Sequence, residues 1–168
     1  LNRINRYWLT FEPQRVALTR IIDYAARNIE ERLDPRQFRC ATDSTGLGLY
    51  ICPTKGKIAK EFNGNNGYIW ICGGVYFDRE DKELCGYFGI GWVRNYTDHI
   101  PKTTTTLLKS KAFNHEDDKY DEWYRYAPFS KILRRSITFE SQSSALAKWI
   151  LTYTPVVLKS LGHIRNVW

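Results

Sequence analysis

The chain contains no methionine, only three histidines, and four cysteines that never form a Cys-x-x-Cys pair. A structural zinc site needs closely spaced ligand pairs, so the sequence argues against a metal centre. Cys72 and Cys85 fall in apolar runs and are expected to be buried free thiols, which is typical of a cytoplasmic protein. Because no initiator methionine is present, we expect the chain to be a module of a longer polypeptide.

Long apolar runs and blocks of like charge are also missing. No stretch approaches the length of a membrane span, and no signal-peptide pattern opens the chain, so we expect no membrane partner. The formal net charge is +7, with eight basic and five acidic groups in residues 1–40, nine and seven in 41–112, and eight and six in 113–168. With no basic tail, any positive field has to come from residues that folding brings together.

Aromatic residues, by contrast, are abundant: six Trp, eleven Tyr and eight Phe. Such side chains fill cores, but they also anchor protein interfaces and stack on nucleic-acid bases. They are densest in residues 67–93, where two aromatic and β-branched runs flank the charged turn 78–83. This pattern predicts an antiparallel hairpin. Both faces of the runs are apolar, so we expect the hairpin at the centre of a sheet that is covered on both sides.

The rest of the chain supplies two helices and further strands. Apolar residues at helical spacing predict amphipathic helices over 14–33 and from Ser141 to Gly162, the second kinked or divided at Pro155. Short strands are predicted at 7–11, within 38–53 and at 123–128, and a short basic helix at 130–136. The Thr-rich segment 103–111 is interpreted as an edge strand or loop, and 115–122 as an acidic loop. The predicted fold is a single α+β domain over residues 1–168, with a mostly antiparallel twisted sheet and a helix from each end of the chain packed on it.

Basic residues concentrate in two segments on either side of the central hairpin. Across 94–112 the chain has four basic residues and one acidic residue. Lysine and arginine neutralise phosphates, and aromatic rings stack on bases. We therefore predict a non-catalytic nucleic-acid-binding domain, with DNA a better fit than RNA. Its predicted contact residues are Lys55, Lys57, Lys60, Arg94, Tyr96, Lys102, Lys109 and Lys111.

Three alternatives remain open. The first is a protein-interaction or oligomerisation module anchored by surplus aromatic residues, with a protein partner or further domains of the same chain bound there. The second is a metal-dependent nuclease that uses the acidic residues 116–122, although no acid-x-Lys pattern falls on a predicted strand. The third is a nucleophilic Cys or Ser, for which no activating pattern is present. Residues 45–48 (Thr-Gly-Leu-Gly) lack both the dinucleotide fingerprint and the P-loop motif, so no cofactor is predicted.

The order Gly-Gly-Val-Tyr-Phe at 73–77, acidic turn, Cys-Gly-Tyr-Phe-Gly-Ile-Gly at 85–91 and closing amphipathic helix resembles the DNA-binding amino-terminal domains of methylation-dependent restriction GTPases. Those domains flip a modified base into an aromatic pocket. The resemblance implies a base pocket on the hairpin, made by Trp70, Tyr76, Tyr87 and Trp92.

Overall fold

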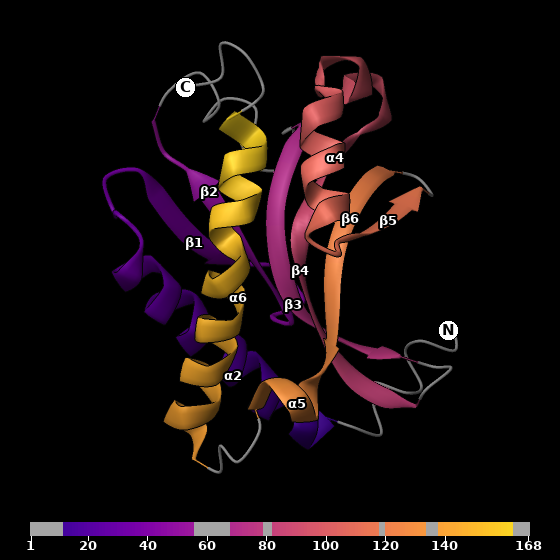
Figure 1. The fold of residues 1–168 in the computed structure, drawn as a ribbon. Coiled ribbons are helices and arrows are strands. Elements are labelled where there is room, and N and C mark those ends of the chain that lie inside the picture. Colours follow the sequence, from indigo (N-terminus) through magenta and orange to yellow (C-terminus); the bar gives the residue numbers. More distant parts are fainter. Residues whose placement is uncertain (1–11, 56–67, 79–81, 118–119, 134–137, 163–168) are drawn as a thin grey trace.

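The computed structural model describes residues 12–55, 68–78, 82–117, 120–133 and 138–162. The strand predicted at 7–11 lies outside these residues. The described residues form a six-stranded antiparallel sheet with helices packed on it, which confirms the predicted α+β class (Figure 1). None of the described helices is both long enough and apolar enough to cross a membrane.

The sheet has the strand order β1-β2-β3-β4-β6-β5, and each neighbouring pair is antiparallel. The hairpin of β3 and β4 therefore lies at its centre, as predicted, and its ten aligned pairs run from Ile69 opposite Trp92 to Asp78 opposite Glu83. The strand bounds are β1 (Phe38–Thr42), β2 (Gly48–Pro53), β3 (Ile69–Asp78), β4 (Glu83–Val93), β5 (Asn114–Asp117) and β6 (Tyr120–Pro128).

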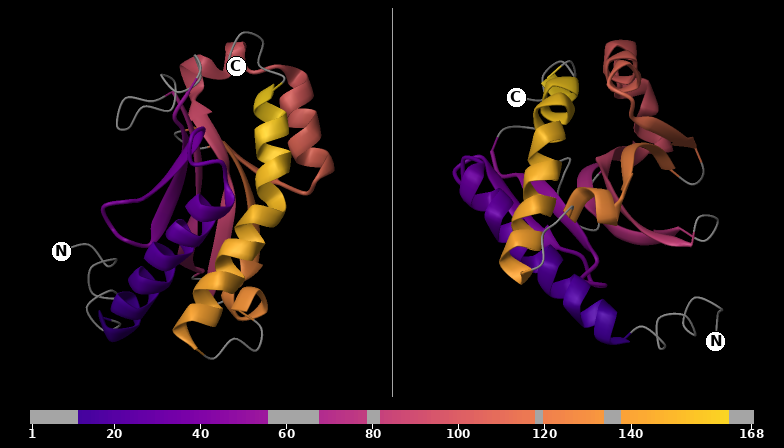
Figure 2. Two further views of the ribbon diagram at one scale, coloured as in Figure 1. Left: turned by 90° about the vertical axis from the view of Figure 1, so that its left-hand side faces the viewer. Right: turned by 60° about the horizontal axis from the view of Figure 1, so that its bottom comes forward.

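The described helices are α2 (Glu12–Arg32), the 3₁₀ helix η2 (Arg94–His99), α4 (Lys102–Ser110), α5 (Phe129–Leu133) and α6 (Phe139–Gly162). The long helices α2 and α6 pack against each other, and α4 and α5 both contact α6 (Figures 1 and 2). Helix α6 is one element that contains Pro155 rather than two separate helices.

One face of the sheet and the helices form the hydrophobic core. Strand positions Ile71, Phe88, Ile90 and Trp92 point to this face and are at most 1% exposed. They pack with buried helix residues such as Ile150. Because side chains alternate between the two faces of a strand, Trp92 points away from Trp70 and Tyr87. Its assignment to a base pocket is therefore wrong: Trp92 is a core residue, fully buried.

The opposite face of the sheet has no described helix packed on it, so the described residues cover only one of the two faces, and we call the other the uncovered face. The residues that made this face look apolar in the sequence are tyrosine, tryptophan, cysteine and glycine. Their rings pack on each other, as Tyr87 does on Tyr124 and Tyr76 on Tyr126. Their polar atoms find partners on the same face, as where Tyr126 donates a hydrogen bond to Glu116. An uncovered face can therefore carry a composition that is typical of a buried one.

Two further segments differ from their predicted structure. The Thr-rich segment is the helix α4, because Thr104 and Leu108, four residues apart, are buried and dock the helix on α6. Tertiary burial here outweighs the β-propensity of threonine. The acidic segment is not a loop, because β5 pairs with the first half of β6, and the ring of His115 bonds to Asp121 at 2.8 Å across that pair.

Candidate functional site

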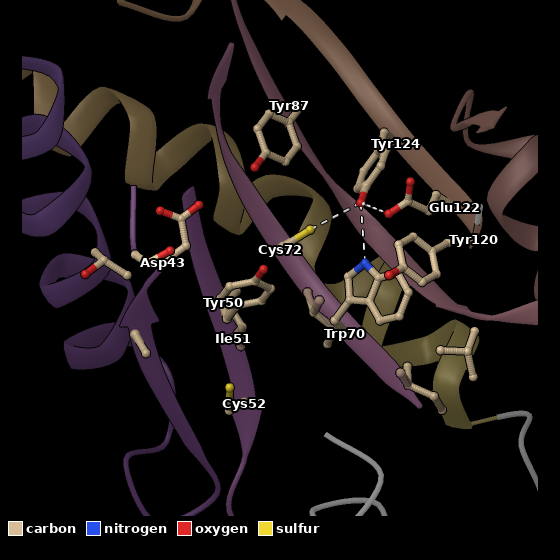
Figure 3. Close-up of a pocket in the computed structure, with 16 residues that line it drawn as sticks. Asp43, Tyr50, Ile51, Cys52, Trp70, Cys72, Tyr87, Tyr120, Glu122 and Tyr124 are labelled. Carbon is tan, nitrogen blue, oxygen red and sulfur yellow. Dashed lines mark hydrogen bonds between the residues drawn. The ribbon is translucent and has the colours of Figure 1, made fainter. Parts of the chain in front are cut away.

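The uncovered face of the sheet holds a cavity of about 680 Å³. It extends from the turn between β1 and β2, across β2, β3 and β4, to β6 (Figure 3). Its most prominent lining residues are five aromatic side chains and two carboxylates, which we call the aromatic pocket: Tyr50, Trp70, Tyr87, Tyr120, Tyr124, Asp43 and Glu122.

Glycines of β4 make room for the rings of this pocket. A Cβ atom at Gly91 would lie 2.6 Å from the indole of Trp70, which crosses β4 at that position. A Cβ atom at Gly89 would lie 2.5 Å from the ring of Tyr124 and 1.9 Å from the carbonyl oxygen of Trp123. These distances are shorter than any van der Waals contact, so only glycine permits the observed ring positions. Close packing of rings on the strand thus explains the glycines at positions 89 and 91.

The hydroxyl of Tyr124, on β6, connects its own strand to β3 at the floor of the pocket. It donates a hydrogen bond to Glu122 Oε1 at 2.7 Å and accepts one from Trp70 Nε1 at 3.4 Å (Figure 3). It also lies 3.4 Å from the Sγ atom of Cys72. Tyr124 is only 7% exposed, so these contacts fix the orientation of Trp70 and Glu122 from within the structure.

Asp43 and Glu122 flank the pocket from different elements, with Tyr50 and Cys72 between them (Figure 3). Asp43 belongs to the β1–β2 turn, where its Oδ1 atom accepts hydrogen bonds from the backbone and the hydroxyl of Thr45. Its Oδ2 atom lies beside Gly48, where a Cβ would meet it at 2.5 Å. Burial raises the pKa of Tyr50 and of Tyr87, and the negative charges of the two carboxylates add to that increase.

Two phenols and a thiol of the pocket, those of Tyr87, Tyr124 and Cys72, are held in their protonated forms. Burial raises the pKa of Tyr87 and of Tyr124, and the negative field of nearby groups adds to the effect. Burial likewise raises the pKa of Cys72 to about 12, although its hydrogen bond with Tyr124 opposes the shift. A thiol with so high a pKa is a poor nucleophile at neutral pH. The pocket therefore favours binding over covalent chemistry at Cys72.

Of the four residues in the predicted base pocket, Trp70 and Tyr87 line the cavity. Tyr76 lies on the same face, with its ring 6.1 Å from that of Tyr87, while Trp92 is in the core. Sequence reasoning missed Tyr50, Tyr124, Asp43 and Glu122. The sequence did contain a signal for Tyr124 and Glu122. They flank the buried Trp123 on β6, so their side chains point to the opposite face of the sheet from that tryptophan.

The described residues among the predicted phosphate contacts belong to several elements of the fold. Arg94 and Tyr96 lie on η2 after β4, where Tyr96 stacks on Tyr68, with centroids 5.5 Å apart and planes 13° from parallel. Lys55 is exposed beyond the end of β2. Lys57 and Lys60 lie outside the described residues.

Lys102 and Lys109 belong to helix α4, and Lys111 follows it directly. Positions 102, 106 and 109 are exposed and spaced by four and three residues, so they share one face of α4. On α6, positions 148, 152, 155 and 159 form a similar exposed stripe with a lysine at each end. The two helices touch where the Thr104 hydroxyl donates to the carbonyl oxygen of Ser160 at 3.0 Å. We call this region the lysine surface: Lys102, Lys109, Lys111, Lys148 and Lys159.

Lys148 and Lys159 were not predicted as contact residues, although their eleven-residue spacing indicates that they share one helix face. No group of three or more His, Cys, Asp or Glu side chains among the described residues is arranged to hold a metal ion. No known protein family, curated protein or solved structure matches the chain.

Proposed function

We propose that the chain is a non-catalytic nucleic-acid-binding domain that contacts the phosphate backbone through the lysine surface. The observation that carries the proposal is the concentration of exposed lysines on two packed helices. Between them, α4 and α6 with Lys111 have five lysines, and Glu140 is their only acidic residue. All five lysines are exposed, and none forms an ion pair with a described residue.

The dimensions of the surface suit a polyanion. Seven residues separate Lys102 from Lys109, which is a rise of about 10 Å along a helix, and eleven separate Lys148 from Lys159, a rise of about 16 Å. Duplex DNA carries a phosphate every ~3.4 Å along each strand, so several phosphates lie within reach of each stripe. On α4, the exposed hydroxyl of Thr106 stands between Lys102 and Lys109 and adds a hydrogen-bond donor for a phosphate oxygen.

The structure changes which residues this proposal uses. Lys102, Lys109 and Lys111 are retained, and Lys148 and Lys159 are added. The aromatic pocket is left out of the phosphate contacts, because it opens on the uncovered face and the lysine surface is on the helix side. Any base contact made with this binding mode has to come from residues outside the pocket. Contacts confined to phosphates give binding with weak sequence preference.

Fluorescence anisotropy with a labelled DNA duplex, a single-stranded DNA and an RNA, each over a series of salt concentrations, tests the proposal. We expect affinity to fall steeply with salt, and the DNA duplex to bind at least as well as the RNA. The double variant Lys109→Gln and Lys159→Gln should lower the slope of log affinity against log salt by about two units.

The matched control is Arg39→Gln combined with Lys82→Gln, which makes the same change in net charge at exposed sites away from α4 and α6. The control should retain most of the wild-type salt slope. Equal losses in the two double variants would show that only net charge matters, and would overturn the assignment to this surface. Absence of binding to all three polymers at low salt would overturn the function itself.

A further inference from the structure

The aromatic pocket differs in charge from the rest of this basic protein. Asp43 and Glu122 are the only charged side chains among the described residues that line the cavity. Tyr50, Tyr87, Tyr124 and Cys72 add no charge near neutral pH, because burial raises their pKa values. The described lining therefore has a formal charge of −2, in a chain whose formal net charge is +7. A cavity whose lining is negatively charged repels phosphates and carboxylates and attracts cations.

The rings of the pocket stand at steep angles to one another. Trp70 and Tyr120 meet at 82°, and Tyr87 and Tyr124 meet at 80°, with centroids 5.1 and 5.5 Å apart. A planar base stacks between parallel rings, and the parallel pair in this region, Tyr68 and Tyr96, is not part of the lining. Rings that stand at steep angles to one another suit a rounded ligand group, such as a substituted ammonium, better than a planar base. Aromatic faces attract a cation placed over them, and tryptophan does so most strongly.

We propose that the aromatic pocket binds an organic cation, in the form of the ammonium or quaternary ammonium group of a free small molecule. Asp43 and Glu122 supply the charge complement from two sides, and Trp70 with the pocket tyrosines supplies the π faces. The volume of about 680 Å³ is in the range of sites that enclose a whole small molecule, which favours a free ligand over a single side chain of another protein. This site is independent of the lysine surface, so either proposal can fail alone.

The pocket is also prepared for such a ligand before it binds. Tyr124 holds Glu122 and Trp70 in place through its hydroxyl, and Thr45 holds Asp43 through two hydrogen bonds. Each carboxylate uses one oxygen in these contacts, which leaves Glu122 Oε2 and Asp43 Oδ2 without a hydrogen bond to any described residue. Groups positioned in this way lose little freedom on binding, which improves affinity.

Titration calorimetry on the full chain tests the site with choline and with 3,3-dimethyl-1-butanol, its uncharged isostere of nearly the same shape. We expect choline to bind at least about tenfold more tightly than the alcohol, because only choline carries the positive charge. Glu122→Gln keeps the acceptor for Tyr124 but removes the charge, and should weaken choline binding on the order of tenfold. Asp43→Asn should act in the same direction.

Glu31→Gln is the control, since Glu31 is exposed on α2 and far from the pocket in the fold. It should leave choline affinity unchanged. Trp70→Leu should abolish most of the binding, with thermal unfolding of each variant measured to confirm that it is folded. The proposal is overturned if the alcohol binds as well as choline, if neither carboxylate variant changes the affinity, or if choline and tetramethylammonium both fail to bind at millimolar concentration.

Discussion

Tyr124 donates a 2.7 Å hydrogen bond to Glu122, two residues earlier on the same strand and the same face of the sheet. This contact keeps the carboxylate beside the pocket while the same hydroxyl accepts a bond from Trp70 of β3. A carboxylate lowers its desolvation cost when a phenol donates to it, and the phenol then holds its own proton more firmly. One buried hydroxyl therefore positions both the indole of Trp70 and the carboxylate of Glu122 in the aromatic pocket.

The first prediction concerns that hydroxyl. Tyr124→Phe removes the donor to Glu122 and the acceptor for Trp70, so it should lower the free energy of unfolding by about 2 kcal/mol. Urea denaturation followed by circular dichroism measures this. Tyr68→Phe is the matched control, because Tyr68 is 47% exposed and its change should stay within about 0.5 kcal/mol. Equal stability of the two variants would show that the Tyr124 contacts contribute nothing.

A second prediction separates two glycines of β4. Gly89→Ala places a Cβ against the backbone carbonyl of Trp123, which cannot move without breaking the sheet, so we expect a loss of about 3 kcal/mol. Gly91→Ala meets the side chain of Trp70 instead, and should cost about 1 kcal/mol while changing the tryptophan fluorescence. Denaturation curves for both variants show which substitution lowers the free energy of unfolding more. If Gly91→Ala were the more damaging, the assigned packing of β4 would be incorrect.

The third prediction tests how α4 is attached. Thr104→Val keeps the shape of a fully buried side chain but removes its hydrogen bond to the Ser160 carbonyl, so unfolding should become easier by about 1 kcal/mol. Amide hydrogen exchange should accelerate in α4 and in the last turns of α6. Thr106→Val, at an exposed position of the same helix, is the control and should change neither quantity. Uniform acceleration across the sheet would contradict a local role.

The fourth prediction concerns alkaline pH. Burial raises the pKa of Cys72 from 9.0 to about 12 and that of Tyr76 from 10.0 to about 12. Between those values the unfolded chain has lost protons that the folded chain keeps, so stability is full below about pH 9 and falls as the pH rises toward 12. Melting temperature measured across this range should decline steadily. In Cys72→Ala the decline should be shallower, and an identical slope would show that this thiol is not the cause.

Several parts of the fold were predictable because the spacing of apolar residues along the sequence indicates directly which side chains are buried. The amphipathic stripe of α2 and the paired runs of β3 and β4 each follow from the spacing of apolar residues. Helix α4 was not predictable in the same way, since four successive threonines favour a strand and only contact with α6 makes them helical. Residues 115–122 were misjudged because charge suggested a loop, whereas pairing with neighbouring strands decides the outcome.

The candidate sites were harder to predict than the fold. Composition could not show which aromatic residues are in the core, and alternation within β4 decides that Trp92 is buried while Tyr87 faces the pocket. Asp43 reaches the pocket from a turn distant in sequence from Glu122, and no local pattern connects the two. The exposed lysines are divided between α4 and α6, two helices that meet where Thr104 bonds to Ser160, and that contact depends on the whole fold.

The most direct test of the central claim is a nuclear magnetic resonance titration of the ¹⁵N-labelled chain with a short DNA duplex at low salt. The lysine surface predicts that amide shifts concentrate in α4 and the exposed stripe of α6, and that the pocket strands β2 and β3 remain unchanged. Shifts confined to the pocket strands, or no shifts at all, would contradict the assignment of nucleic-acid binding to the helix side of this protein.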